Sequence, residues 1–271
     1  MMQRPCVLVC AGLDPSGGAG LAADIGAIAA QGAHALPALT VLTVQDNDRV
    51  HAIAPLPAAQ VLAQIDALRA KIPFSVIKLG ILGSLEIAQA LAARITEWRA
   101  QQPDLQVVLD PVLASGAGDA LAAQDPCRIL APLLPVSDVL LPNLPEAARL
   151  AQALQPGVAA DAAAQAQAIL QSGCRQLLLK GGHAEGGMVE NHWFDASGWR
   201  RQWQWPRLHG AFHGSGCTLA AALAARLALG ERMEAALLAA QTYTQCALGL
   251  AYPVADGQWI PARQLPATRF V

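Results

Sequence analysis

Short apolar runs with the composition of buried strands alternate with helix-like segments along the chain. Residues 6–12 (CVLVCAG), 38–44 (ALTVLTV) and 74–82 (FSVIKLGIL) are continuous apolar runs of strand length. Between them, residues 20–32 and 58–72 place apolar side chains at helical spacing. Strands that are apolar on both faces and are separated by helices predict an α/β fold, with a mostly parallel central sheet and helices on both of its faces.

Two residues are predicted to mark helix ends. Gly32 is the last residue of segment 20–32, and a glycine just after a helix can adopt the left-handed conformation that closes it. Ser84 is the first residue of segment 84–101, where a serine hydroxyl can accept a backbone hydrogen bond as the N-cap.

One segment interrupts the alternation. Residues 188–206 hold four of the six tryptophans, and Trp199, Trp203 and Trp205 alternate so that they share one side of an extended strand. A turn-like DASG sequence lies in the middle of this segment. We therefore expect a small β-hairpin insertion whose aromatic face covers an edge of the sheet.

Composition excludes several classes of protein. The chain has 271 residues, of which 54% are hydrophobic and 14% charged, which excludes a disordered chain. A net charge of −2 argues against nucleic acid or an anionic membrane as a partner. The longest apolar stretch is interrupted by Arg226 and is too short for a bilayer. No signal peptide or internal linker is visible, and the six cysteines are scattered without a CxxC pair, so we expect one domain, 1–271, in the cytoplasm.

Glycine-rich or polar residues follow several predicted strands, and ligands of open parallel sheets bind beyond these carboxyl ends. The first such segment, residues 11–24 (AGLDPSGGAGLAAD), is rich in glycine, which lets a backbone approach a ligand closely. It matches neither the Rossmann nor the P-loop pattern. Asp24 in this segment lies within an otherwise apolar helix, where a carboxylate needs water or a partner.

Single polar residues end the other strands. The amide of Gln45 offers a donor and an acceptor, which suits a nitrogen heterocycle. Asp110 is a candidate magnesium ligand. Asn143 and Glu146 can both point toward the strand ends, although helix capping explains Asn143 equally well. Lys180 is followed by glycines that leave room for a nucleotide phosphate.

Cys217 opens an alanine-rich helix directly after Gly214, Ser215 and Gly216. The unpaired N–H groups of a helix start attract anions and can stabilise a phosphoryl group during its transfer. A thiol at this position can have its pKa drawn below about 8.5 and could accept a proton from an attacking hydroxyl. From these residues alone, an inert core cysteine stays open as the alternative.

In this order and at these separations, the segments resemble the hydroxymethylpyrimidine/phosphomethylpyrimidine kinases of thiamin biosynthesis, in the ribokinase-like superfamily. The resemblance covers nearly the whole chain and rests on AGLDPSGGAGLAAD, LPNLPEA, LLKGGH and HGSGCTLAAALAA. It implies a ribokinase-like three-layer sandwich, ATP and Mg²⁺ as cofactors, and a homodimer. It also implies phosphorylation of hydroxymethylpyrimidine, and then of its monophosphate to the diphosphate.

The resemblance further implies a role for each matching residue. Gly12, Asp24, Gln45, Ile81 and Val108 would line the pyrimidine pocket. The nucleotide and its metal would be held by Asn143, Glu146, Lys180 and Asp110. Gly214, Ser215 and Gly216 would form the anion hole, with Cys217 as the base.

The chain departs from the family pattern where Gly210 and Gln258 replace two lysines, and where Asp46 follows Gln45. These losses leave open a catalytically weak pyrimidine-binding protein derived from such a kinase. A pyridoxal or pyridoxine kinase is a second alternative, because it shares the fold and phosphorylates a similar hydroxymethyl group. A cysteine hydrolase that pairs Cys217 with His213 is a third.

Overall fold

The computed structural model describes residues 3–116 and 118–264. Within them the chain forms a nine-stranded sheet in the order β3-β2-β1-β4-β5-β6-β7-β8-β9. The strands from β2 through β1 and β4 to β7 are parallel, while β3, β8 and β9 join antiparallel at the two edges. The strands are β1 (Cys6–Leu13), β2 (His34–Gln45), β3 (Val50–Pro55), β4 (Val76–Leu79), β5 (Gln106–Leu109), β6 (Val139–Leu140), β7 (Gln176–Leu179), β8 (Met188–Asp195) and β9 (Gly198–Pro206).

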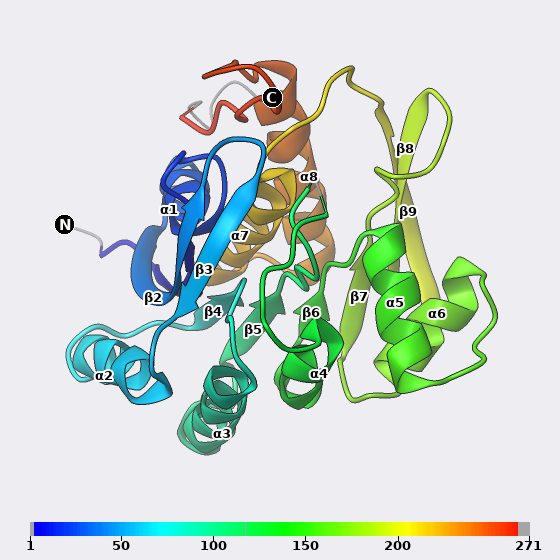
Figure 1. Cartoon of the computed structure of the whole chain (residues 1–271). Helices are drawn as coiled ribbons and strands as arrows, with labels where there is room; N and C mark the ends of the chain where they lie inside the picture. The colour runs from blue at the N-terminus through cyan, green and yellow to red at the C-terminus, as the bar shows by residue number, and fades with distance from the viewer. Residues whose placement is uncertain (1–2, 117, 265–271) are drawn as a thin grey trace.

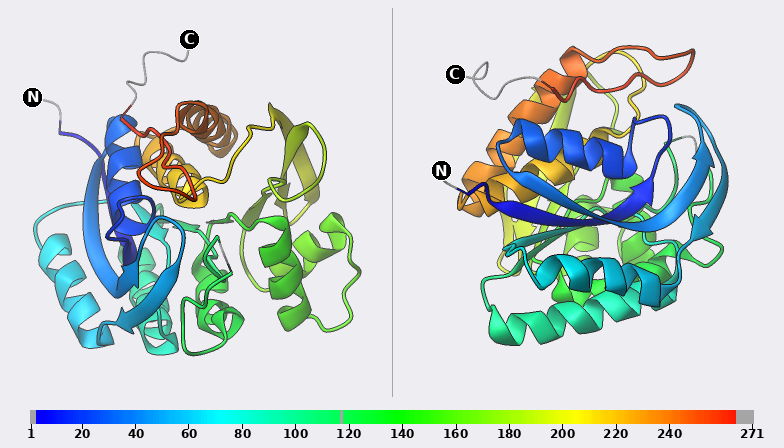
Figure 2. Two further views of the ribbon diagram at one scale, coloured as in Figure 1. Left: turned by 45° about the horizontal axis from the view of Figure 1, so that its top comes forward. Right: turned by 90° about the vertical axis from the view of Figure 1, so that its left-hand side faces the viewer.

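Helices cover both faces of this sheet (Figures 1 and 2). One face carries α1 (Gly20–Ala30), α7 (Ser215–Ala228) and α8 (Met233–Gly249). The other carries α2 (Ala58–Arg69), α3 (Leu85–Gln101), α4 (Pro126–Leu130), the 3₁₀ helix η1 (Ala131–Val136), α5 (Leu144–Leu154) and α6 (Ala162–Leu170). The predicted three-layer sandwich with a mostly parallel central sheet is therefore confirmed. Within the described part of the chain, no helix is long and apolar enough to cross a membrane.

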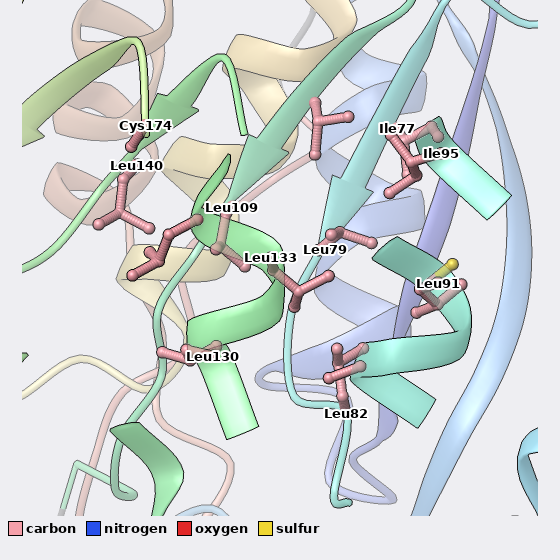
Figure 3. Close-up of a cluster of buried hydrophobic side chains, with 14 of the residues drawn as sticks. Ile77, Leu79, Leu82, Leu91, Ile95, Leu109, Leu130, Leu133, Leu140 and Cys174 are labelled. Atoms are coloured by element: carbon pink, nitrogen blue, oxygen red, sulfur yellow. The ribbon is translucent and has the colours of Figure 1, made fainter. Parts of the chain in front are cut away.

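The sheet separates two hydrophobic cores because successive strand residues point to opposite faces. In β4, Ile77 and Leu79 face the core under α2 and α3, where they pack near Leu91 and Ile95 (Figure 3). Val76 lies in the other core, beneath α1 and α7. Full burial of each such aliphatic side chain contributes roughly 1.5–3 kcal/mol.

The predicted helix ends are confirmed. Gly32 has a φ of +90° and follows the C-cap of α1, and the Ser84 hydroxyl accepts a hydrogen bond from the backbone N–H of Ile87 at 3.2 Å. The sequence prediction failed at β2, which begins at His34 rather than residue 38, and it missed β3. Four of the six β3 residues are exposed, so this edge strand lacks the apolar pattern of a buried one.

The tryptophan-rich hairpin forms as β8 and β9, and β8 pairs with β7, so the hairpin extends the sheet. Trp193 and Trp203 are buried and stack with ring centroids 6.4 Å apart. Trp205 packs against the same core, whereas Trp199 is 60% exposed. The expectation of a covered aromatic face therefore holds for Trp203 and Trp205 and is wrong for Trp199.

Candidate active site

The carboxyl ends of the parallel strands open into one cavity of about 710 Å³, a size typical of small-molecule sites. Because parallel strands all end at the same edge of a sheet, residues that are far apart in the sequence meet here. The cavity is lined by these predicted site residues: Gly12, Gln45, Ile81, Asp110, Asn143, Glu146, Lys180, Gly214, Ser215, Gly216 and Cys217.

Two residues that were expected in the pocket do not line the cavity. Val108 is fully buried inside β5, where it pairs with Lys78 of β4 and packs in the core beneath α7, too deep to reach a ligand. Asp24 is also fully buried, and its carboxylate lies 2.8 Å from the Lys78 ammonium. Lys78 is the member of this pair that reaches the cavity.

The start of α7 forms one wall of the cavity. Its N-cap, Gly214, has a φ of +79°, and a Cβ there would lie 2.0 Å from the backbone oxygen of Gly18, so glycine is required. The guanidinium of Arg263 donates hydrogen bonds to the Gly18 oxygen and to the Thr218 hydroxyl, which ties the first glycine loop to the helix. The first N–H groups of α7 have no acceptor within the helix and remain available for an anion.

A lysine and two carboxylates face this helix start. The Lys180 ammonium lies 3.3 Å from Asp110 and 4.0 Å from Glu146. A Cβ on Gly216 would come within 3.3 Å of the Lys180 nitrogen, so the lysine and the helix start adjoin. Burial alone would lower the pKa of Lys180, but the two carboxylates raise it above its usual value. The site therefore holds a permanent cation beside the helix N-terminus.

Asn143 and Glu146 form a capping box at the start of α5. The Asn143 side chain accepts from the Glu146 N–H at 2.8 Å, and the Glu146 carboxylate accepts from the Asn143 N–H at 2.7 Å. The capping explanation of Asn143 is thus confirmed, although both residues also line the cavity. Burial raises the pKa of Glu146.

The protein carboxylates at this site could bind Mg²⁺ only if a substrate phosphate supplied further ligands. In the described part of the chain, no group of three or more His, Cys, Asp or Glu side chains is placed to hold a metal ion. Asp110 and Glu146 supply two carboxylates on either side of Lys180. Mg²⁺ commonly takes one or two protein carboxylates and completes its shell with water and substrate phosphates.

Cys217 lines the cavity, directly after Gly216, which adjoins Lys180 and Asp110. Burial raises the pKa of the Cys217 thiol to about 11, and the carboxylates of Asp24 and Asp110 add to this effect. The Lys78 ammonium opposes the rise. The prediction of a lowered pKa is therefore wrong, because burial outweighs the effect of the helix start.

Asp14 was not predicted as a site residue, and His213 was considered only as a partner of Cys217. The His213 ring nitrogen Nε2 lies 2.7 Å from the Asp14 carboxylate, and both residues line the cavity. Burial alone would raise the pKa of Asp14, but hydrogen bonds from His213 and Gln45 hold it below its usual range. Among the described residues, no hydrogen bond joins His213 to Cys217, so the geometry does not support the hydrolase alternative.

Lys78 was also missed as a site residue. The sequence shows only a single lysine within the apolar run VIKL, which would equally fit a strand with one solvent-exposed face. Its full burial and its aspartate partner become visible only in the structure.

Residues 14–260 match the model of the phosphomethylpyrimidine kinase family. The chain belongs to this family. It is 36% identical over 226 residues to the hydroxymethylpyrimidine/phosphomethylpyrimidine kinase of Salmonella typhimurium, with 83% of each chain covered. It is also 36% identical over 255 residues to the thiamine biosynthesis bifunctional protein ThiED of Geobacter sulfurreducens, and the match spans 94% of this chain but only 51% of that longer relative.

The fold is shared with a solved structure of a different vitamin kinase. The pyridoxal kinase from Staphylococcus aureus, in complex with AMP-PCP and pyridoxal, is similar with a TM-score of 0.83 at 26% identity, covering 97% of this chain and 94% of that one. The predicted ribokinase-like fold is confirmed.

The two positions where phosphomethylpyrimidine kinases were expected to carry lysine both line the cavity. Gln258 is buried, and its side-chain oxygen would lie 2.9 Å from a Cβ on Gly116. The backbone oxygen of Gln258 accepts a hydrogen bond from the Asn47 amide. Gly210 has a φ of +111°, a conformation in which a lysine would be strained.

Of three arginines that could replace the missing lysine charges, only Arg207 lines the same cavity. Arg207 lines the cavity and donates to the backbone oxygens of Gly182 and Gly186, which fixes the glycine loop after β7. Arg263 ties the glycine loop after β1 to α7. Arg201 instead pairs with Glu234, and neither residue lines the cavity.

Proposed function

We propose that this family member transfers the γ-phosphoryl group of ATP to the hydroxymethyl group of an aminopyrimidine, and then a second phosphoryl group to the monophosphate, as in thiamin biosynthesis. The observation that carries this proposal is the convergence in one cavity of the α7 N-terminus, Lys180 and Cys217. This arrangement brings together N–H groups that can bind an anion, a lysine cation and a proton acceptor, as phosphoryl transfer requires.

The acceptor end of the site suits a ring that carries an amino group. Gln45 lines the cavity, and its amide carries both a hydrogen-bond donor and an acceptor. Its carbonyl oxygen would accept a hydrogen bond from an exocyclic amino group. Ile81 and Gly12 line the same cavity and leave room for a flat apolar ring.

The donor end suits a nucleotide triphosphate. Lys180 and the first N–H groups of α7 would hold the transferring phosphoryl group, and Arg207 fixes the glycine loop beside it. Asp110 and Glu146 would hold Mg²⁺, which when bound neutralises phosphate charge. The S. aureus relative was solved with an ATP analogue, which supports ATP as the donor here.

In the proposed step, the acceptor oxygen forms a bond to the γ-phosphorus while the bond from that phosphorus to the leaving ADP oxygen breaks. The hydroxyl proton passes to the sulfur of Cys217, and the N–H groups of residues 214–216 stabilise the charge on the phosphoryl oxygens. Burial disfavours the thiolate that must accept this proton, and the Lys78 ammonium favours it.

Release of ADP tests the proposal and separates it from the alternatives. Mg²⁺-ATP would be supplied with hydroxymethylpyrimidine, its monophosphate or pyridoxal in separate reactions. We expect turnover with both pyrimidines. Turnover with pyridoxal alone would establish the pyridoxal kinase alternative, which the S. aureus likeness favours. Pyrimidine binding without ADP release would establish a weak binding protein instead.

We also propose that the whole chain, 1–271, forms one kinase domain that works in the cytoplasm as a homodimer. The six free cysteines support a reducing compartment. The dimer rests on the family resemblance, and light scattering of the purified chain tests it by a mass near twice 28.2 kDa.

A further inference from the structure

A lysine stands where the sheet otherwise carries valines. Lys78 lies in the middle of β4, and its sheet neighbours are Val9 of β1 and Val108 of β5. Its side chain is fully buried on the face covered by α1 and α7. Lysine is almost never fully buried unless it is paired, so this position demands an explanation.

The partner of Lys78 is Asp24 of α1, which is equally buried, at 2.8 Å. The pair is only partly satisfied, because the second Asp24 oxygen, Oδ1, is buried and has no hydrogen bond from any described residue. Replacing a buried ion pair by apolar side chains is often neutral or stabilising. Stability of the fold is therefore a weak reason for a charged pair at this place.

Lys78 also lines the cavity, as Cys217 does, and its ammonium would lie 3.0 Å from a Cβ on Gly80, another lining residue. One of its three N–H donors goes to Asp24. The charged groups that act on the Cys217 sulfur come from five separate parts of the chain. They are Lys78 of β4, Asp24 of α1, Asp110 after β5, Lys180 after β7 and Arg263 near the C-terminus. Lys78 is the cation that most favours a charged sulfur, and Asp24 opposes it.

We propose that Lys78 is a positioning residue that stabilises the Cys217 thiolate, while Asp24 holds the Lys78 ammonium at the cavity wall. This inference rests on the proposed function, in which Cys217 accepts the proton of the acceptor hydroxyl. Lys78 keeps its own proton throughout. The thiol loses its proton to water before each cycle, takes the hydroxyl proton as the oxygen–phosphorus bond forms, and releases it again.

The two members of the pair then have opposite effects on the sulfur. Lys78→Met removes the cation, and the stranded Asp24 carboxyl, whose pKa burial already raises to about 6, takes up a proton. The thiolate is then less stable even though the Asp24 charge is also lost, because Lys78 acts on the sulfur more strongly than Asp24 does. Asp24→Asn removes the anion that competes for Lys78, so the thiolate becomes its nearest counterion and gains stability. A purely structural ion pair would give both variants the same kind of damage.

The test measures alkylation of Cys217 by iodoacetamide in the full chain between pH 6 and 10, with EDTA present, and quantifies the modified peptide by mass spectrometry. At pH 8 we expect Lys78→Met to slow alkylation by about tenfold or more and Asp24→Asn to accelerate it by a similar factor. Lys71→Met, at an exposed position in the turn after α2, is the matched control and should leave the rate unchanged.

Equal or same-direction changes in both variants would overturn the inference. Circular dichroism shows whether each variant is folded. If Lys78→Met does not fold, Asp24→Asn decides alone, because slower or unchanged alkylation contradicts the proposal. The assay contains no ATP or pyrimidine, so its result is independent of whether the chain proves to be a kinase.

Discussion

Gly214 is the residue on which the shape of the anion site depends most directly. Its φ of +79° costs any other residue about 1–2 kcal/mol. A Cβ would also lie 2.0 Å from the Gly18 oxygen and 2.8 Å from the Arg263 guanidinium. Since the first of these is a backbone atom, the glycine loop would have to move away from α7. We expect Gly214→Ala to lower the free energy of unfolding by roughly 2–4 kcal/mol, as steric strain in a packed site does.

Urea unfolding gives the stability change, and the ADP assay gives turnover. We expect turnover to fall by about 10² or more, because the donors of α7 move relative to the phosphoryl group. Gly249→Ala, at the end of α8 with open space around its Cβ, is the matched control and should leave stability within about 1 kcal/mol. A Gly214→Ala variant with normal stability and normal turnover would refute this account of the helix start.

Three other predictions concern ionisable groups. Cys217→Ala should lower kcat by about 10²–10⁴ with little change in KM, and normal turnover would remove Cys217 from the mechanism. Lys180→Met should lower kcat/KM for ATP by about 10² or more in steady-state assays, and an unchanged value would place the phosphates elsewhere. Burial raises the pKa of Cys10, Cys174 and Tyr243 to about 12. Because these groups are neutral in the folded chain, their contribution to stability is complete below about pH 9 and is lost as pH rises toward 12. Urea midpoints should therefore fall between pH 8 and 10.5, and a constant midpoint would contradict the burial of these groups.

The position of most site residues follows from sequence alone, because topology decides it. Once the strands are parallel, the residues after β1, β5 and β7 must share one edge, which brings the first glycine loop, Asp110 and Lys180 together. Glycines at helix ends, such as Gly32 and Gly214, also follow from local backbone rules.

The remaining features depend on how deeply a side chain is buried and on contacts between residues far apart in the sequence. A local sequence pattern specifies neither. The sequence does not show that Val108 lies below the cavity, since this depends on where β5 ends relative to β4. Asp24 and Lys78 are 54 positions apart, and only packing of α1 against the sheet joins them. The high pKa of Cys217 likewise depends on burial and on charges from other parts of the chain. The expectation that a helix N-terminus lowers the pKa of a thiol takes neither into account.

The central claim, phosphoryl transfer to a hydroxymethylpyrimidine, is tested most directly by ³¹P NMR of the reaction products. The chain would be incubated with Mg²⁺-ATP and hydroxymethylpyrimidine, and the spectrum followed until ATP is consumed. We predict a new phosphate monoester signal, then a diphosphate pair, each growing with ADP. A spectrum in which ATP yields only ADP and inorganic phosphate, or remains unchanged while the pyrimidine is bound, would contradict the account.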